Sequence, residues 1–103
     1  MNQPQLSIAS MDAGRDSAWI GHAHKAIRDI CAARRGTPAN ALTTDAVWAL
    51  LEKRGIAPPN EPRAIAAAME RAQKEGLIAP TMEHVKSSRE VAHKRPIKIW
   101  RVL

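Results

Sequence analysis

The sequence is poor in the residues that build covalent or metal-based frameworks. It has one cysteine, Cys31, and neither tyrosine nor phenylalanine in 103 residues. A single cysteine cannot form an intramolecular disulfide or supply a cysteine-based zinc site. No apolar run approaches the roughly 18 residues that a membrane-spanning helix requires, and the N-terminus lacks the basic start and apolar stretch of a secretory signal. We therefore predict one soluble, intracellular domain with no membrane contact.

The sequence also shows no pattern typical of a catalytic or metal site. There is no glycine-rich loop for a phosphate, and Cys31 falls on an apolar stripe, where it is expected to behave as a small hydrophobic residue. His22 and His24 are two positions apart, and on a helix such residues point in different directions. We predict that the protein is not an enzyme, binds no metal and needs no cofactor.

Positive charge, in contrast, is abundant and unevenly distributed. The formal net charge is +6, and residues 84–103 carry six basic residues against Glu90 alone. A local basic excess attracts polyanions, chiefly nucleic acid or an anionic membrane surface. The alternative is a solvated C-terminal tail whose charge only keeps the protein soluble.

The first third of the chain predicts an arm followed by a helix. Residues 1–15 show no sustained period and are predicted to form a flexible N-terminal arm. Apolar residues then recur at spacings of three and four, which predicts a helix over residues 16–35. Asp16 or Ser17 can cap its first turn, and Gly36 can end it.

Two further helices have clear start and stop signals. Thr43 is the predicted N-cap of the second helix, and Gly55 its end. The third helix is predicted to be capped by Asn60, to have Pro62 in its first turn and to end at Gly76. Its predicted inner face consists of Ile65, Ala68, Met69 and Ala72.

The C-terminal third predicts a β-hairpin. The segments LIAPTMEHV and PIKIWRVL favour strands, and the polar, basic run KSSREVAHKR between them favours the hairpin tip. Pro80 suits an edge position or a bulge. Three helices followed by a basic hairpin is the element order of a winged helix-turn-helix domain. Residues 16–103 are therefore predicted to form such a domain, mainly α with a small β-hairpin.

The outer face of the third helix indicates DNA binding. A helix that enters the major groove must let its backbone approach the bases, and Ala66 and Ala67 supply that clearance. The N-terminal end of the helix also offers backbone N–H groups to a phosphate. The alternative is a solvated face on which Glu70 and Lys74 form an ion pair. The predicted DNA-binding residues here are Asn60, Arg63, Ala66, Ala67, Glu70, Arg71 and Lys74.

The hairpin, or wing, supplies a second set of predicted contacts. Its cations can neutralise phosphates, and its serines can either donate to phosphate or stabilise the turn. The predicted wing residues are Lys86, Ser87, Ser88, Arg89, His93, Lys94 and Arg95. The only aromatic residues, Trp19, Trp48 and Trp100, lie in apolar patterns, so we predict that they pack in the core and do not stack on bases.

Several motifs in residues 42–103 are shared with one group of proteins. They are TTDAVWALL, EPRAIAAAMERA and GLIAPT, together with Lys86, Ser87, His93, Arg95, Pro96 and Trp100. In these motifs the chain resembles small winged helix-turn-helix proteins encoded by actinobacterial phages and prophages. The connection GIAPPN is longer than the usual turn of about 3–4 residues. The resemblance implies a DNA-binding protein of the bacterial cytoplasm or nucleoid that regulates transcription or assists replication or recombination.

Binding of duplex DNA is thus the leading prediction, with the third helix in the major groove and the wing on the backbone. One alternative is a protein-interaction module that docks a host or phage protein through the same faces. A weaker alternative is RNA binding. The sequence leaves open whether the protein is a monomer or a homodimer.

Overall fold

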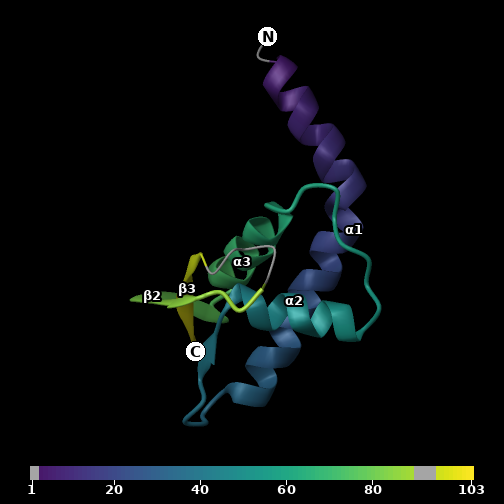
Figure 1. The fold of residues 1–103 in the computed structure, drawn as a ribbon. Coiled ribbons are helices and arrows are strands. Elements are labelled where there is room, and N and C mark those ends of the chain that lie inside the picture. The colour runs from purple at the N-terminus through teal and green to yellow at the C-terminus, as the bar shows by residue number, and fades with distance from the viewer. Residues whose placement is uncertain (1–2, 90–94) are drawn as a thin grey trace.

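The protein consists of three helices and a three-stranded antiparallel sheet (Figure 1). The computed structural model describes residues 3–89 and 95–103, with side chains from residue 16 onward. The elements in chain order are α1 (Gln3–Arg34), β1 (Ala41–Leu42), α2 (Thr44–Lys53), α3 (Ala64–Lys74), β2 (Ile78–Lys86) and β3 (Pro96–Val102).

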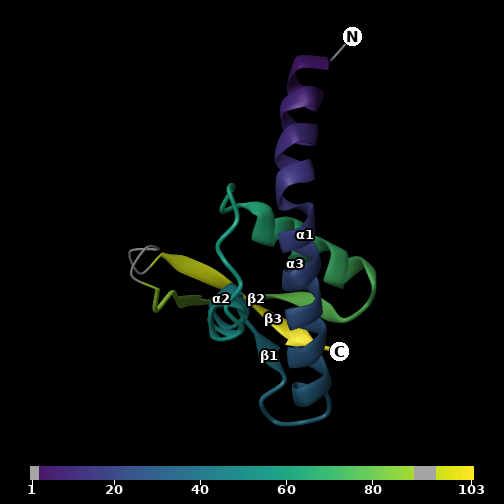
Figure 2. The same cartoon turned by 90° about the vertical axis from the view of Figure 1, so that its right-hand side faces the viewer.

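Helix α1 begins much earlier than predicted. Residues 3–15 belong to it, so the prediction that they lie outside the first helix is wrong, and Asp16 lies inside the helix and does not cap it. Gln, Leu, Ala and Met in this segment favour a helix, but a repeating apolar stripe is required only where a helix buries one face. Figures 1 and 2 show the N-terminal half of α1 extending away from the other elements.

The predicted ends of the helices are largely confirmed. The backbone N–H of Ala46 donates to Oγ1 of Thr43 at 3.4 Å, so Thr43 caps α2. Gly36, Gly55 and Gly76 follow the three helices with φ of 73–78°, a conformation that costs glycine little. Helix α3 is the exception, because it begins at Ala64 and its N-cap position is Arg63 rather than Asn60.

The core lies where α2, α3 and the sheet pack against the C-terminal half of α1 (Figure 1). All four predicted inner residues of α3 are buried, and Ala64 joins them. The tryptophan prediction is confirmed as well: Trp19 is buried, and Trp48 and Trp100 pack partly buried against the core. The rings of Trp19 and Trp48 lie 5.1 Å apart between centroids, which joins α1 to α2.

The sheet contains one strand more than predicted. The strand order is β1-β3-β2, and in β1 Ala41 pairs with Arg101 while Leu42 pairs with Trp100. A two-residue strand is too short to show an alternating pattern, so it could not be predicted from the sequence. The prediction for Pro80 is confirmed, because β2 is an edge strand and its register shifts between Pro80 and His84.

Candidate nucleic-acid interface

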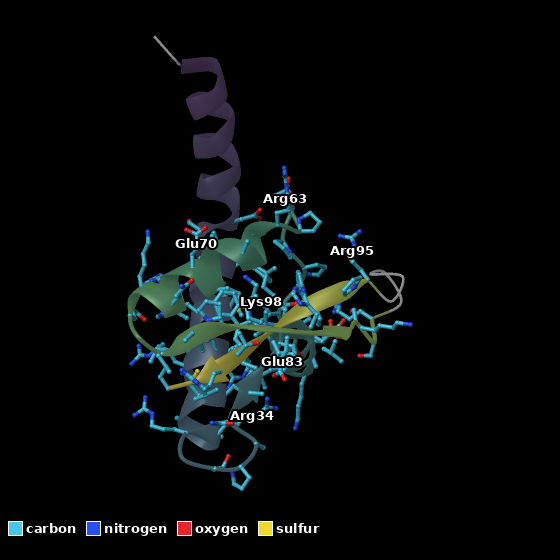
Figure 3. All side chains as sticks on the ribbon, turned by 90° about the vertical axis from the view of Figure 1, so that its left-hand side faces the viewer. Arg34, Arg63, Glu70, Glu83, Arg95 and Lys98 are labelled. Carbon is cyan, nitrogen blue, oxygen red and sulfur yellow. The ribbon has the colours of Figure 1, made fainter. Side chains whose placement is uncertain are left out.

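The outer face of α3 is open along its whole length. We use this name for the exposed side chains on the side of α3 opposite the buried one. All seven residues predicted to bind DNA from this region are exposed. Gln73 is exposed beside them and was missed by the prediction, although its place between Arg71 and Lys74 could have indicated it. Figure 3 shows Arg63 and Glu70 projecting outward from the α3 region.

Two cations of this face have no acidic partner. Arg71 and Lys74 form no ion pair with any residue in the described part of the chain, and the alternative pair of Glu70 with Lys74 is not formed. Arg63 does have a partner, because its Nε lies 3.4 Å from Oε1 of Glu61. The backbone N–H and side chain of Arg63 lower the pKa of Glu61. Arg71 and Lys74 are therefore the cations of α3 best able to meet an anion.

Helix α1 holds α3 at both ends. Asp16 is buried, and its two carboxylate oxygens accept hydrogen bonds from the backbone N–H groups of Asn60 at 2.9 Å and Glu61 at 3.0 Å. At the other end, Nε2 of His24 lies 2.5 Å from Oε1 of Glu75. These contacts fix α3 against α1 through residues more than 40 positions apart in the sequence.

The Asp16 contact corrects one prediction. The backbone N–H groups before α3 were expected to be unpaired and to bind a phosphate. Instead, Asn60 and Glu61 donate to Asp16, and the N–H of Arg63 donates to the side chain of Glu61 at 3.2 Å. The backbone N–H groups of Asn60, Glu61 and Arg63 therefore already have carboxylate partners.

The 87–89 segment of the wing packs against α2, with Ser87 buried, Arg89 half-buried and Ser88 exposed. Ser87 is only 2% exposed, and its hydroxyl donates to Asp45, with 2.8 Å and 3.0 Å to the two carboxylate oxygens. Ser88 donates to the same carboxylate through its backbone N–H at 2.7 Å and its hydroxyl at 3.2 Å. The donors of Ser87 and Ser88 are thus engaged by Asp45, which favours their turn-stabilising role over contact with a phosphate.

Arg89 also packs against α2, where it contacts Trp48 and Glu52. Its guanidinium lies 4.6 Å from the centroid of the Trp48 ring, and Nη1 lies 3.9 Å from Oε2 of Glu52. Its side chain is only 25% exposed. Arg89 was predicted to bind DNA, but in this structure it packs on α2, and we remove it from the candidate interface.

The remaining wing cations are accessible. Lys86 and Arg95 are exposed and form no ion pair with the described residues, whereas His93 and Lys94 lie outside the described residues. Figure 3 shows Arg95 and Lys98 on the side of the hairpin nearer α3, and Glu83 on the opposite side. Arg95 and Lys98 therefore lie on the same side of the hairpin as α3.

The register of the hairpin adds two residues that the prediction missed. His84 pairs with Lys98, so their side chains share one face of the sheet with Trp100 and Lys86. Nζ of Lys98 lies 5.2 Å from the centroid of the Trp100 ring. The alternation of PIKIWRVL could have indicated Lys98, but the place of His84 depends on the bulge in β2, which the sequence does not specify.

Several cations elsewhere are bound within the protein. Arg34 donates to the carbonyl oxygen of Ala41 at 2.7 Å, and Arg35 to that of Leu103 at 3.1 Å. Arg54 donates to Asp29 at 2.8 Å, and this hydrogen bond lowers the pKa of the Asp29 carboxyl. These contacts stabilise the fold. Exposed cations that form no ion pair with the described residues include those on α3 (Arg71, Lys74) and on the hairpin (Lys86, Arg95, Lys98), and also those on α1 (Arg28) and α2 (Lys53).

Comparison of the chain with protein-family models, curated proteins and solved structures finds no match. No helix in the described part of the chain combines the length and the apolar character needed to cross a membrane.

Proposed function

We propose that the protein binds duplex DNA as a winged helix-turn-helix domain. In this proposal α3 enters the major groove and the β2–β3 hairpin lies against the phosphate backbone. The observation that carries it is the open outer face of α3, where exposed alanines lie beside two cations that form no ion pair with the residues that the structure describes. The order of helices and strands, with a short strand before the second helix and a hairpin after the third, agrees with this domain type.

The side chains of α3 suit a groove. Its 11 residues span roughly 16 Å, and the major groove is about 12 Å wide. Ala66 and Ala67 allow close approach of the backbone and can touch a thymine methyl group. Arg71 and Lys74 can donate to guanine edges or phosphates, and Gln73 can form a bidentate contact with adenine. We propose that base recognition comes from this helix.

The hairpin suits the backbone. Lys86, Arg95 and Lys98 are exposed, and a cation placed beside a phosphate contributes affinity without reading sequence. Together with α3 they would engage about six phosphates, a number typical of small DNA-binding domains. We propose that such binding serves transcription regulation or assists replication or recombination, as in the phage and prophage proteins that residues 42–103 resemble.

The experiment that tests this proposal is a salt titration of binding to random and selected duplexes. If about six phosphates are engaged, affinity falls by about 10³ between 50 and 200 mM salt. A selection from a random pool should then enrich one sequence, and the wild-type protein should bind it more tightly than random DNA. Binding that does not change with salt contradicts the proposal.

One observation supports a protein partner as the second candidate. Met82 on the edge strand β2 is 95% exposed, and Val85 is 45% exposed. An exposed thioether on an edge strand is a usual contact for another protein. If micromolar protein gives no mobility shift with random duplex DNA at low salt, this second function replaces the first.

A further inference from the structure

Asp45 is an acid next to a surface that is proposed to bind DNA. Its place in the first turn of α2 would suit the helix dipole alone, yet its carboxylate accepts from Ser87 and Ser88, 42 and 43 residues further along the chain. A negative charge near bound phosphates weakens binding by simple repulsion. If Asp45 contributes to DNA binding, it must do so through its contacts with Ser87 and Ser88 and not through its charge.

The residues that hold the 87–89 segment form one stripe on α2. Asp45, Trp48 and Glu52 are separated by three and four positions, so they lie on the same side of the helix. Asp45 binds the two serines, and the pair of Trp48 and Glu52 holds Arg89. Two separate attachments fix both position and orientation of the segment, which a single contact would not do.

Lys86 and Arg95 directly depend on this attachment. Lys86 precedes Ser87 in the chain, and the backbone N–H of Ser87 donates to the carbonyl oxygen of Arg95 at 2.8 Å. Fixing Ser87 therefore fixes the backbone at Lys86 and Arg95, two exposed cations that form no ion pair within residues 3–89 and 95–103. A binding surface ordered in advance loses less conformational entropy when it binds.

We propose that Asp45 is a positioning residue for the wing. It holds the 87–89 segment on α2, so that Lys86 and Arg95 reach the same duplex as the outer face of α3. This inference rests on the proposed DNA binding, and it concerns how the wing acts rather than whether it is basic.

Positioning and plain charge predict opposite results for Asp45→Ala. Removing an acid raises the net charge and should strengthen binding if only charge matters. Release of the wing instead removes the phosphate contacts of Lys86 and Arg95. That loss lowers the log–log salt slope by about two and weakens binding at 0.1 M salt by about tenfold or more.

The experiment compares four full-length proteins in the salt titration. They are the wild type, Asp45→Ala, Asp45→Asn and the control Glu83→Ala. Glu83 is an exposed acid of the hairpin without an ion pair among the described residues, so Glu83→Ala should bind more tightly with an unchanged slope. Asp45→Asn keeps an acceptor oxygen for the serines and should recover most of the binding lost in Asp45→Ala. If Asp45→Ala behaves like Glu83→Ala, the positioning role is overturned.

A second measurement decides the inference without DNA. The backbone N–H of Ser88 donates directly to Asp45, so its hydrogen exchange by NMR should accelerate in Asp45→Ala while the amides of α3 stay protected. Ser88→Asp places a second carboxylate against Asp45 at an exposed position and should accelerate exchange at Ser87. If the wild type binds no DNA, the proposed function fails, and these exchange rates still test the attachment. Unchanged exchange in both variants overturns it.

Discussion

The outer face of α3 and the 87–89 segment of the wing look alike in the sequence but differ in the folded protein. Both combine small polar or apolar residues with cations, and both were predicted to contact DNA. In the structure Arg71 and Lys74 remain unpaired, while Ser87, Ser88 and Arg89 are engaged by Asp45, Trp48 and Glu52 of α2. A polar residue is available to a partner only when no distant element of its own chain has already bound it.

The largest effect is expected for a substitution on the outer face of α3. Ala66→Glu places a carboxylate in the middle of the outer face of α3, where it would face phosphates or bases without a partner. We expect DNA affinity to fall by about 100-fold or more, because burying an unpaired charge costs several kcal/mol. Fluorescence anisotropy with a labelled duplex measures this loss of affinity.

Ala49→Glu is the matched control for this change. Ala49 is an exposed alanine of α2, which the proposal keeps out of the major groove, and the substitution changes the net charge equally. We expect only a small loss of affinity and similar thermal stability in both variants. Equal losses of affinity in the two variants would mean that α3 has no special role.

The second effect tests the contact that holds α3 in place. Asp16→Ala removes the acceptor for the N–H groups of Asn60 and Glu61, and we expect it to lower the free energy of unfolding by about 2 kcal/mol. Urea unfolding monitored by tryptophan fluorescence measures this change. Asp29→Ala on the same helix removes two solvent-screened ion pairs, with Lys25 and Arg54, so its loss should be below about 1 kcal/mol. An equal effect of both substitutions would contradict a special role for Asp16.

The third effect compares cations across the two regions. We expect Arg71→Ala to weaken binding to a selected site by about tenfold, since a good base contact is worth about 1–3 kcal/mol. The same change should weaken binding to random DNA less. Arg89→Ala should lower stability slightly and weaken binding less than Arg71→Ala does, because Arg89 packs on Trp48 and acts on DNA only by helping Asp45 to hold the wing. Both measurements use the same anisotropy assay, and a larger affinity loss for Arg89→Ala would reverse our assignment of the two regions.

The smallest effect is expected for the ion pair of Arg54 with Asp29, which lies outside both regions. Arg54 lowers the pKa of Asp29 below its ordinary value of 3.8. The ionised Asp29 carboxyl therefore stabilises the folded protein fully at pH values above 3.8. This stabilisation is lost as the pH falls through the lower pKa that Asp29 has in the folded state. We expect less than about 1 kcal/mol, because water screens an exposed pair. Unfolding experiments between pH 6 and pH 2.5 should show a smaller loss in Arg54→Ala than in the wild type, because only Lys25 then lowers the pKa of Asp29.

Local patterns in the sequence determined the helices and much of the core. The cap at Thr43, the glycine ends and the inner residues of α3 depend on spacing within one turn or one helix, so they could be predicted. The openness of the outer face of α3 followed from the same periodicity. The extension of α1 to Gln3 was not predicted, because residues 1–15 show no sustained apolar period in the sequence.

Only the tertiary structure decided which polar groups are occupied. Asp16 reaches the residues before α3, Asp45 reaches the serines of the wing, and β1 pairs with β3, each across a long stretch of chain. Hydrogen bonds between such distant residues depend on how elements pack, and no local spacing encodes that packing. The sequence by itself therefore determined which side chains are basic, and the fold decided which of those on α3 and the wing remain open to a partner.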